Sequence, residues 1–421
     1  MERFLPFLKK ILPKAFLEKT LPVYHKVLPL LGAIIYRFPS RNIFVIGVTG
    51  TKGKTTVTEL IYRVLNQAGY KVTLSNTIHF IIEEKEERNL FKMTMPGRMF
   101  LQKFLRRAVD AGCQFAIIEM SSEGAKLYRH HHIQLDAFIF TNLTPEHIEA
   151  HGSFEAYKAA KLRIRDALVY SRKKNKLVVV NRDDSHSEDF ARVPDAKKLS
   201  YSIRDVAPSI TTDRGSLFTY KGVSVHTPLK GTFNIENALA VITLTEALGV
   251  PFEKIKKTLE TLKPIAGRVE EIVCGQNFSV FVDYAHTKES LEALYRTFPN
   301  KRKICVLGNC GGGRDRWKRP EMGAIADTYC DEIILTNEDP YDEDPRVIIE
   351  EMTTGFKTHT PLILLDRKKA IRKALSLARA KDVVLITGKG TDPYIMEAEG
   401  KKTPWSDAEV VREELERLLK E

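Results

Sequence analysis

The chain has 421 residues, 43% of them hydrophobic, and its 66 Lys and Arg against 54 Asp and Glu give a net charge of +12. That length predicts about two or three domains with sizeable cores. The charge fits nucleic acid, an anionic membrane or a polyphosphate substrate as partner. The sequence has no RNA-binding or zinc-finger pattern and no run mixing aromatic with basic residues, so we expect no nucleic-acid partner.

The five cysteines are odd in number and form no C-x-x-C pair. Neither a disulfide framework nor a zinc ribbon is therefore indicated, and a reducing, cytoplasmic location is expected.

Residues 1–41 form a separate basic segment. Leu5–Pro13 (LPFLKKILP) recurs as Leu21–Pro29 (LPVYHKVLP). The longest uncharged stretch, Val27–Tyr36, is far shorter than the roughly 20 residues of a membrane-spanning helix, and a signal-peptide cleavage pattern is missing. Two interpretations stay open. The segment forms short helices docked on the next domain, or it makes peripheral contact with the anionic inner face of a membrane.

A glycine-rich loop follows between a predicted strand, Ile43–Val48, and a predicted amphipathic helix, Thr56–Ala68, which Gly69 ends. This is the setting in which a loop holds phosphates, although Val48 replaces the small residue usual at its position. Backbone N–H groups, one lysine and one hydroxyl for Mg²⁺ would bind a nucleoside triphosphate. The binding residues are Gly50, Thr51, Lys52, Gly53, Lys54, Thr55 and Thr56.

From Asn42 onward, apolar runs typical of strands alternate with helical patterns. This order predicts an α/β fold with parallel sheets, whose chemistry belongs at the carboxyl ends of the strands. The runs are Phe115–Ile118, Ala137–Phe140, Leu177–Val180, Lys303–Leu307, Ile333–Leu335 and Val383–Ile386. Polar or glycine residues follow them at Glu119, Asn142, Asn181, Gly308, Asn337 and Gly388.

A metal site is predicted beside the loop. Glu119 ends its strand where a second carboxylate would coordinate Mg²⁺; an ordinary surface salt bridge is the alternative. His147 and Lys161 follow the next strand. A lysine beside a metal is chemically sensible if it is carbamylated, because a carbamate is an anionic oxygen ligand.

The chain resembles the Mur ligase family, most of all its MurE branch, from about residue 42 to the C-terminus. The motifs that carry the resemblance occur in order: Thr49–Thr56, Glu119–Ser122, Thr141–His147, His151–Lys161, Phe233–Asn237, Gly267–Glu270, Val282–Thr287, Gly311–Pro320 and Gly388–Gly390. The resemblance does not include the usual N-terminal uridine-binding domain, in whose place stand residues 1–40.

The resemblance implies a helical N-terminal segment (1–41), a central ATP-binding P-loop domain (42–266) and a C-terminal Rossmann-like domain (267–421). It implies an ATP- and Mg²⁺-dependent enzyme of peptidoglycan synthesis that adds an amino acid to a UDP-N-acetylmuramyl-peptide. A substrate carboxylate would attack ATP to give an acyl phosphate, which an amine then displaces. Two alternatives stay open: a ligase of this fold acting on folate or polyglutamate, and a non-catalytic nucleotide-binding module.

The same resemblance assigns further residues. Lys54, Glu119, His147 and Lys161 would be catalytic, with Thr55 joining the last three as metal ligands. Asn237 and His286 would contact adenine, Asp283 the ribose and Arg268 the phosphates, in a site completed when the domains close. The acceptor would be held by Thr94, Ser121, Ser122 and Arg129, and the amino acid by Arg314, Asp339, Tyr341, Gly388 and Asp392. Strand-end carboxylates, local turns and surface salt bridges are the alternative roles.

Two departures from the family pattern stand out. Glu338-Asp-Pro-Tyr341 lacks the arginine with which diaminopimelate-adding members clamp a second carboxylate. The acidic residues Asp339, Asp342, Glu343, Asp344 and Asp392 favour a cationic side chain, with L-lysine the first candidate. The run His130–His132 is expected to be a solvated loop rather than a metal site.

Overall fold

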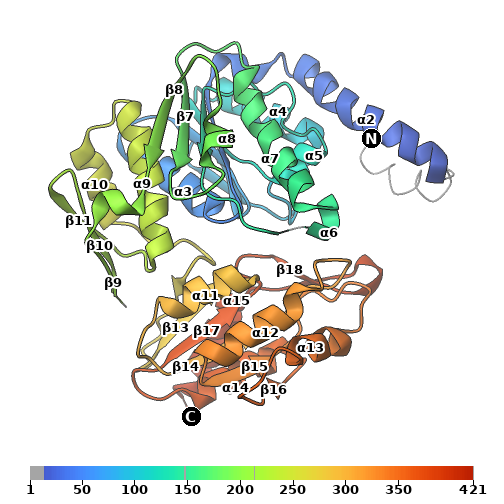
Figure 1. The fold of residues 1–421 in the computed structure, drawn as a ribbon, viewed down its shortest axis with the longest axis vertical. Helices are drawn as coiled ribbons and strands as arrows, with labels where there is room; N and C mark the ends of the chain where they lie inside the picture. Colours follow the sequence, from blue (N-terminus) through green and yellow to red (C-terminus); the bar gives the residue numbers. More distant parts are fainter. Residues whose placement is uncertain (1–13, 147, 213, 421) are drawn as a thin grey trace. The chain divides into compact units, whose positions relative to one another are not determined.

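The structure is a computed structural model that describes residues 14–146, 148–212 and 214–420 (Figure 1). The chain forms two compact units that interleave along the sequence. The first comprises Met1–Pro145, Phe154–Asp205 and Glu236–Thr258, and the second Glu146–Ser153, Val206–Ile235 and Leu259–Glu421. The boundaries inferred from the sequence, at 41 and 266, stay predictions.

The first unit is built on an eight-stranded sheet in the order β4-β3-β2-β5-β1-β6-β7-β8. Its strands are β1 Phe44–Thr49, β2 Val72–Ser75, β3 His79–Ile82, β4 Lys85–Arg88, β5 Phe115–Glu119, β6 Ala137–Phe140, β7 Lys176–Asn181 and β8 Ala196–Tyr201. β3 and β4 are antiparallel to their neighbours, and the others are parallel. The predicted α/β fold is confirmed.

Helices cover the sheet because successive strand residues point to opposite faces. Val45 of β1 joins a core with residues of α4, α7 and α8, whereas α3 contacts β1, β2 and β5. The helices that contribute to this unit are α2 Lys14–Ile35, η2 Pro39–Asn42, α3 Lys54–Gln67, α4 Arg98–Asp110, α5 Ser122–Lys126, α7 Phe154–Val169, α8 Ser187–Ala191, α9 Thr232–Ala247 and α10 Phe252–Glu260.

In the described part of the N-terminal segment, from residue 14 on, helix α2 continues through Pro22 and Pro29 and is longer than the short helices expected from the repeat. The second copy of the repeat lies inside α2, and the first copy, Leu5–Pro13, lies outside the described residues. α2 packs against α4. None of the described helices has the length and apolar character needed to cross a membrane.

The second unit is built on a six-stranded sheet in the order β12-β13-β17-β14-β15-β16, parallel except at β12. Its strands are β12 Glu270–Glu271, β13 Ser279–Asp283, β14 Lys303–Leu307, β15 Glu332–Leu335, β16 Leu362–Ile363 and β17 Val383–Thr387. Two smaller sheets contain β9 Ser209–Thr212, β10 Gly215–Tyr220 and β11 Val223–Thr227, and β18 Tyr394–Met396 and β19 Lys402–Pro404.

Two apolar cores hold the large sheet of the second unit between helices. One face packs against α11, α12 and α13, and the other against α14 and α15. The helical segments of the second unit are α6 Ile148–His151, α11 Lys288–Arg296, α12 Lys318–Tyr329, α13 Pro345–Thr353, α14 Arg367–Leu377, η4 Ala398–Gly400 and α15 Asp407–Leu418, and η3 Ile203–Val206 lies at the boundary between the units in the sequence.

The expectation that no cysteines pair is wrong for Cys305 and Cys330, which form a disulfide. α12 ends at Tyr329, and β15 then begins beside Ile304 of β14. This return brings the two cysteines to a Cα–Cα distance of 6.2 Å although they are 25 residues apart in the sequence. Spacing alone does not reveal such a pair.

A buried ion pair joins α14 to α15. Arg367 donates from Nε and Nη2 to the two carboxylate oxygens of Asp407 at 2.8 and 2.7 Å, and both residues are buried. Arg367 also donates to the carbonyl of Thr387 at the end of β17. The pair therefore fixes both helices to the sheet.

We predict that Arg367→Met lowers the free energy of unfolding by about 3–5 kcal/mol, because it leaves the Asp407 carboxylate buried without its cation. Urea denaturation followed by circular dichroism measures the change. Lys368→Met is the matched control, since Lys368 pairs with Glu413 at the surface of the same two helices and should contribute little. Equal effects of the two substitutions would contradict this role for Arg367.

Candidate active site

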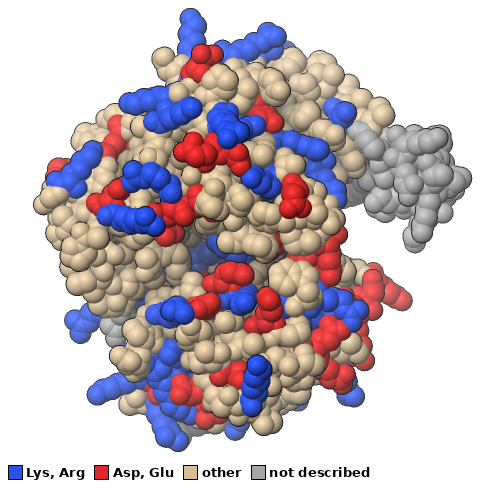
Figure 2. Space-filling view, viewed as in Figure 1, with Lys and Arg blue, Asp and Glu red and all other residues tan. Residues whose placement is uncertain are grey.

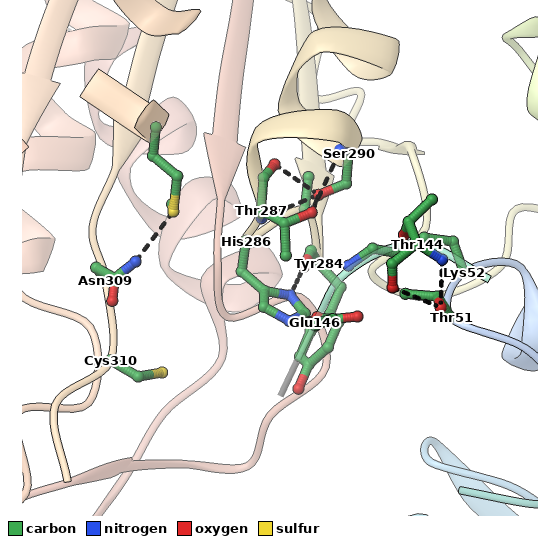
Figure 3. A network of polar contacts seen from close by, with 12 residues as sticks. Thr51, Lys52, Thr144, Glu146, Tyr284, His286, Thr287, Ser290, Asn309 and Cys310 are labelled. Carbon is green, nitrogen blue, oxygen red and sulfur yellow. Dashed lines mark hydrogen bonds and ion pairs between the residues drawn. The ribbon is translucent and has the colours of Figure 1, made fainter. Parts of the chain in front are cut away.

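The phosphate loop follows β1, which is the point in the large sheet of the first unit where the chain continues to strands on opposite sides. β1 has β5 on one side and β6 on the other, so the loop after Thr49 stands between the ends of both neighbours. The hydroxyl of Thr51 contacts Tyr157 of α7 at 3.0 Å and accepts from Thr144 N at 3.0 Å (Figure 3). Binding crevices of α/β sheets form at such switch points.

The loop is held by the segment that follows β6. The backbone N–H groups of Thr51 and Lys52 donate to the carbonyl and the side-chain oxygen of Asn142, both at 2.8 Å. Thr141 Oγ1 donates to the Lys52 carbonyl at 2.7 Å. Two N–H groups that the sequence assigned to phosphate thus contact Asn142 in this structure.

Lys54 lies within the loop. It is the first residue of α3, and its ammonium donates to the carbonyls of Gly50 and Thr51 at 2.9 and 2.8 Å. Gly53 precedes it with φ of 81°, and a Cβ there would lie 2.3 Å from Asn237 Oδ1. Glycine is therefore required at 53 by conformation and by contact.

Glu119 ends β5 opposite Val48 of β1, and its carboxylate is buried. Thr55 Oγ1 lies 3.1 Å from each carboxylate oxygen. Thr77 donates to Glu119 from its backbone nitrogen at 2.9 Å and from its hydroxyl at 3.0 Å, and that hydroxyl also contacts Thr94 at 3.0 Å. The structure thus brings together the predicted residues Thr55, Glu119 and Thr94.

Lys161 of α7 is buried, and its ammonium donates to the Gly50 carbonyl at 2.6 Å. It also lies over the ring of Tyr157, one helical turn earlier, at 4.8 Å. α7 therefore presents a lysine and a tyrosine to the phosphate loop. The third predicted ligand, His147, lies outside the described residues.

The predicted acceptor residues gather around Met95. Ser121 caps α5 by accepting from Gly124 N at 3.2 Å, and its own N–H points to the Met95 sulfur at 3.4 Å. Arg129 donates to the Met95 carbonyl, the neighbour of Thr94. Ser122 is buried at the first position of α5.

The expectation that residues 130–132 form a solvated loop is wrong for His130, which is buried. Burial, with smaller contributions from His131 and Arg163, lowers the pKa of His130 to about 3. A run of three histidines does not reveal which of its members the fold buries.

In the second unit, Asp283, Arg268 and His286 lie near the carboxyl end of β13. Asp283 accepts from the N–H groups of Val269 and Ala285, both at 2.7 Å. Arg268 lies over the ring of Tyr284 at 4.7 Å and donates to the Gly267 carbonyl. The contacts of Asp283 with Val269 and of Arg268 with Tyr284 hold the 267–269 turn against the end of β13.

His286 has contacts at both ring nitrogens (Figure 3). Nδ1 contacts the Tyr284 carbonyl at 2.7 Å, and Nε2 contacts Glu146 Oε1 at 3.0 Å. The next residue, Thr287, begins α11 with a capping box completed by Ser290. The turn carrying His286 is therefore fixed by a helix start.

The predicted amino-acid residues Asp339, Gly388 and Asp392 meet at the ends of β15 and β17. The buried ammonium of Lys389 donates to Asp339 Oδ1 at 2.8 Å and lies 3.5 Å from Asp392 Oδ2. A Cβ at Gly388, where φ is 103°, would lie 2.2 Å from Glu338 Oε2. Sequence reasoning did not assign a role to Lys389.

Tyr341 and Arg314 lie on the loops around this cluster. Tyr341 donates its N–H to the Met396 carbonyl at 3.0 Å, and a Cβ at Gly312 would lie 2.8 Å from its ring. The charge of Asp392 and burial raise the pKa of Tyr284 well above its ordinary value, while Arg314 acts in the opposite direction. Arg314, Tyr284 and Asp392 therefore share one electrostatic environment.

Among the described carboxylates of this cluster, Glu338 has an oxygen that is open to a cationic group of a ligand. It is buried, Cys310 Sγ lies 2.9 Å from its Oε1, and its Oε2 has no hydrogen-bond partner among the described residues. Burial raises the pKa of the Cys310 thiol well above its ordinary value, so the thiol is the donor. Cys310, Glu338 and Asp339 are close enough to share a metal ion, but a neutral thiol and the Lys389 ammonium disfavour one.

The donor set fits ATP and Mg²⁺. Hydroxyl and carboxylate oxygens are the ligands that Mg²⁺ prefers, and Thr55 and Glu119 offer one of each at the start of α3. Asn142, Thr77, Tyr157 and Lys389 were not predicted as site residues. Of these, Asn142 stands out in the sequence only as a strand end, and Thr77 follows β2, which is too short to be predicted from its sequence.

Glu236, next to Asn237, has a strongly perturbed carboxyl group. Burial, with the nearby Asp183 and Asp184 carboxylates, raises the pKa of Glu236 from 4.5 to about 7. Between these values the folded chain keeps a proton that the unfolded chain has lost. The free energy of unfolding should therefore fall as the pH rises through this window.

We predict that Glu236→Gln, which cannot ionise, becomes more stable than the wild type across this window, by on the order of 2 kcal/mol above pH 7. Urea denaturation of both proteins at a series of pH values measures the difference. Stability curves that run parallel at all pH values would show that Glu236 is not protonated in the folded chain.

Comparison with known proteins agrees with this geometry. Residues 48–245 match the Mur ligase middle domain, and residues 267–390 match the Mur ligase glutamate ligase domain. A UDP-N-acetylmuramoyl-L-alanyl-D-glutamate–2,6-diaminopimelate ligase from Syntrophomonas wolfei subsp. wolfei is 35% identical over 390 residues, covering 89% of this chain and 79% of the relative. A UDP-N-acetylmuramyl-tripeptide synthetase from Roseiflexus is 36% identical over 416 residues, covering 92% and 81%.

Among solved structures, a UDP-N-acetylmuramoyl-L-alanyl-D-glutamate–2,6-diaminopimelate ligase has 29% sequence identity and a TM-score of 0.60, covering 90% of this chain and 79% of that one. The two matched domains together span most of residues 48–390, which include the phosphate loop, Glu119, Lys161 and Lys389. The chain therefore belongs to the Mur ligase family.

Proposed function

We propose that this chain uses ATP and Mg²⁺ to join an amino acid to a UDP-N-acetylmuramyl-peptide through an acyl phosphate. The supporting observation is the group of Thr55, Glu119 and Lys161 around the phosphate loop. Nucleotide binding alone would not need a buried lysine on the Gly50 carbonyl as well as a buried carboxylate on Thr55. The two relatives described above are named as ligases of this kind.

In the first step, a carboxylate of the acceptor attacks the γ-phosphate of ATP. Lys54 and the start of α3 bind the phosphates, and Thr94, Ser121 and Arg129 orient the acceptor. Mg²⁺ held by Thr55, Glu119 and the Lys161 carbamate, with His147, would neutralise the triphosphate charge. Such catalysis consists mostly of positioning and charge neutralisation.

In the second step, the amine of the incoming amino acid displaces phosphate from the acyl phosphate. We propose that this amino acid has one carboxylate, with L-lysine the first candidate, because Tyr341 replaces the arginine that would bind a second one. The acidic residues expected to bind its cationic side chain already have partners. Asp339 and Asp392 contact Lys389, and Glu343 contacts Arg319. Asp342 accepts from the N–H of Glu399, and Asp344 caps α13. Among the acidic residues of this region, Glu338 is therefore our candidate for the cationic side chain.

The first test is phosphate release measured with each pairing of acceptor and amino acid. UDP-N-acetylmuramyl-L-Ala-D-Glu with L-lysine should give the highest kcat/KM, above the same acceptor with meso-diaminopimelate. Turnover only with folate or polyglutamate acceptors would favour the alternative ligase reading. No amino-acid-dependent release with any acceptor would contradict ligase activity.

Tyr341→Arg sharpens the amino-acid part of that test. The guanidinium should raise kcat/KM for meso-diaminopimelate relative to L-lysine by about tenfold or more, since it supplies a bidentate carboxylate partner. Tyr341→Phe is the control and should leave the ratio close to that of the wild type. If wild-type enzyme already prefers meso-diaminopimelate, the monocarboxylate proposal is wrong.

The second test concerns Lys161. Lys161→Ala should reduce kcat by at least about 10³-fold, because it removes the carbamate and its charge from the metal site. Added bicarbonate should not restore activity, whereas small carboxylates such as acetate should restore part of it by filling the vacated position. Full activity of Lys161→Ala would exclude the carbamate role.

A further inference from the structure

Helix α2 has an exposed apolar stripe. Its members are between 39% and 60% exposed although all are aliphatic: Val23, Val27, Leu30, Leu31, Ile34 and Ile35. At 3.6 residues per turn, these positions fall within an arc of about 140° on one side of the helix. Exposed aliphatic residues on one face, rather than scattered singly, indicate a surface that binds something.

Between Val23 and Ile35, the opposite side of α2 is buried. Leu28, Pro29, Gly32 and Ala33 face the rest of the first unit, and a Cβ at Gly32 would lie 3.4 Å from Met99 and Gln102 of α4. Each side therefore has a separate role. The buried side packs the helix against α4, and the aliphatic stripe stays exposed to solvent.

The composition of the stripe favours lipid over protein as its partner. Energetically dominant residues of protein interfaces are enriched in Trp, Tyr and Arg, and the stripe contains none of them. Interfacial helices instead place an aliphatic face in the boundary between head groups and acyl chains and carry basic residues beside it. α2 matches that description and, as noted, is not suited to span the bilayer.

The charged residues around the stripe are mainly basic, which suits an anionic lipid surface. The stretches 14–42 and 98–110, which hold α2 and its neighbour α4, contain nine Lys or Arg and two acidic residues. Lys26, Arg37, Arg41 and Lys103 are exposed. Elsewhere on the face drawn in Figure 2, Lys and Arg are interspersed with Asp and Glu. A second copy of the chain would bring like charges together at α2.

We propose that the exposed stripe of α2 docks on an anionic lipid bilayer, with the surrounding Lys and Arg contacting phosphate head groups. Burial of the aliphatic side chains and attraction to anionic lipid then act together. Docking positions the enzyme at the membrane through a surface separate from the phosphate loop and the amino-acid residues. It is independent of which amino acid the enzyme adds.

The test is co-sedimentation of the full chain with vesicles of phosphatidylcholine, with and without phosphatidylglycerol, at low and high salt. The wild type should bind the anionic vesicles and lose binding as salt rises. The variant V27E/L31E/I34E should lower the partition coefficient by at least about tenfold. Y170E/V273E/L419E is the control, because it makes the same charge change at exposed residues elsewhere.

Each result decides the proposal. No wild-type binding to anionic vesicles overturns it, as does equal loss of binding in the control variant. A wild type that dimerises in light scattering through the stripe, with a monomeric V27E/L31E/I34E, also overturns it, in favour of a second copy. Binding that appears only after deletion of residues 1–13 also overturns it, because the intact chain then does not dock. Unchanged melting temperature and phosphate release show that the variants are folded.

Discussion

The parallel hydrogen-bond ladder of each sheet is the constraint on which the candidate site depends. In the first unit, Val48 pairs with Glu119 and Thr49 pairs with Phe140. This register places the phosphate loop, the Glu119 carboxylate and Asn142 together at the carboxyl ends of the strands. In the second unit, β13, β17, β14 and β15 are neighbours, so Asp283, Gly388, Cys310 and Glu338 follow adjacent strand ends. Residues far apart in sequence meet because the register of the paired strands fixes the positions of their carboxyl ends.

Local patterns were sufficient to predict the parts of the site carried by a continuous segment. The loop, α3 and six strand runs follow from short stretches whose apolar residues are buried in the structure. Thr77 could not be found in this way. It reaches Glu119 only because the sheet order places β2 beside β5, and β2 is too short to stand out.

The sequence also cannot tell what a polar side chain contacts. Asp283 and Glu338 both follow apolar strands, yet one accepts two backbone N–H groups and the other keeps an oxygen without a partner among the described residues. His130 is buried within a run that reads as polar. For Glu338 the contacting thiol, Cys310, comes from the loop after another strand, whose position depends on the whole fold.

The partners of the buried carboxylates decide which of them can bind a cation. Thr55 and Thr77 contact the Glu119 carboxylate with neutral hydroxyl and N–H groups beside the phosphate loop. Asp339 lies against the ammonium of Lys389, which cancels its negative charge. A buried charge without a counter-ion is costly. Asp339 therefore already has a cationic partner in Lys389, whereas in the proposed function Glu119 would receive its cation as Mg²⁺ at the phosphate loop.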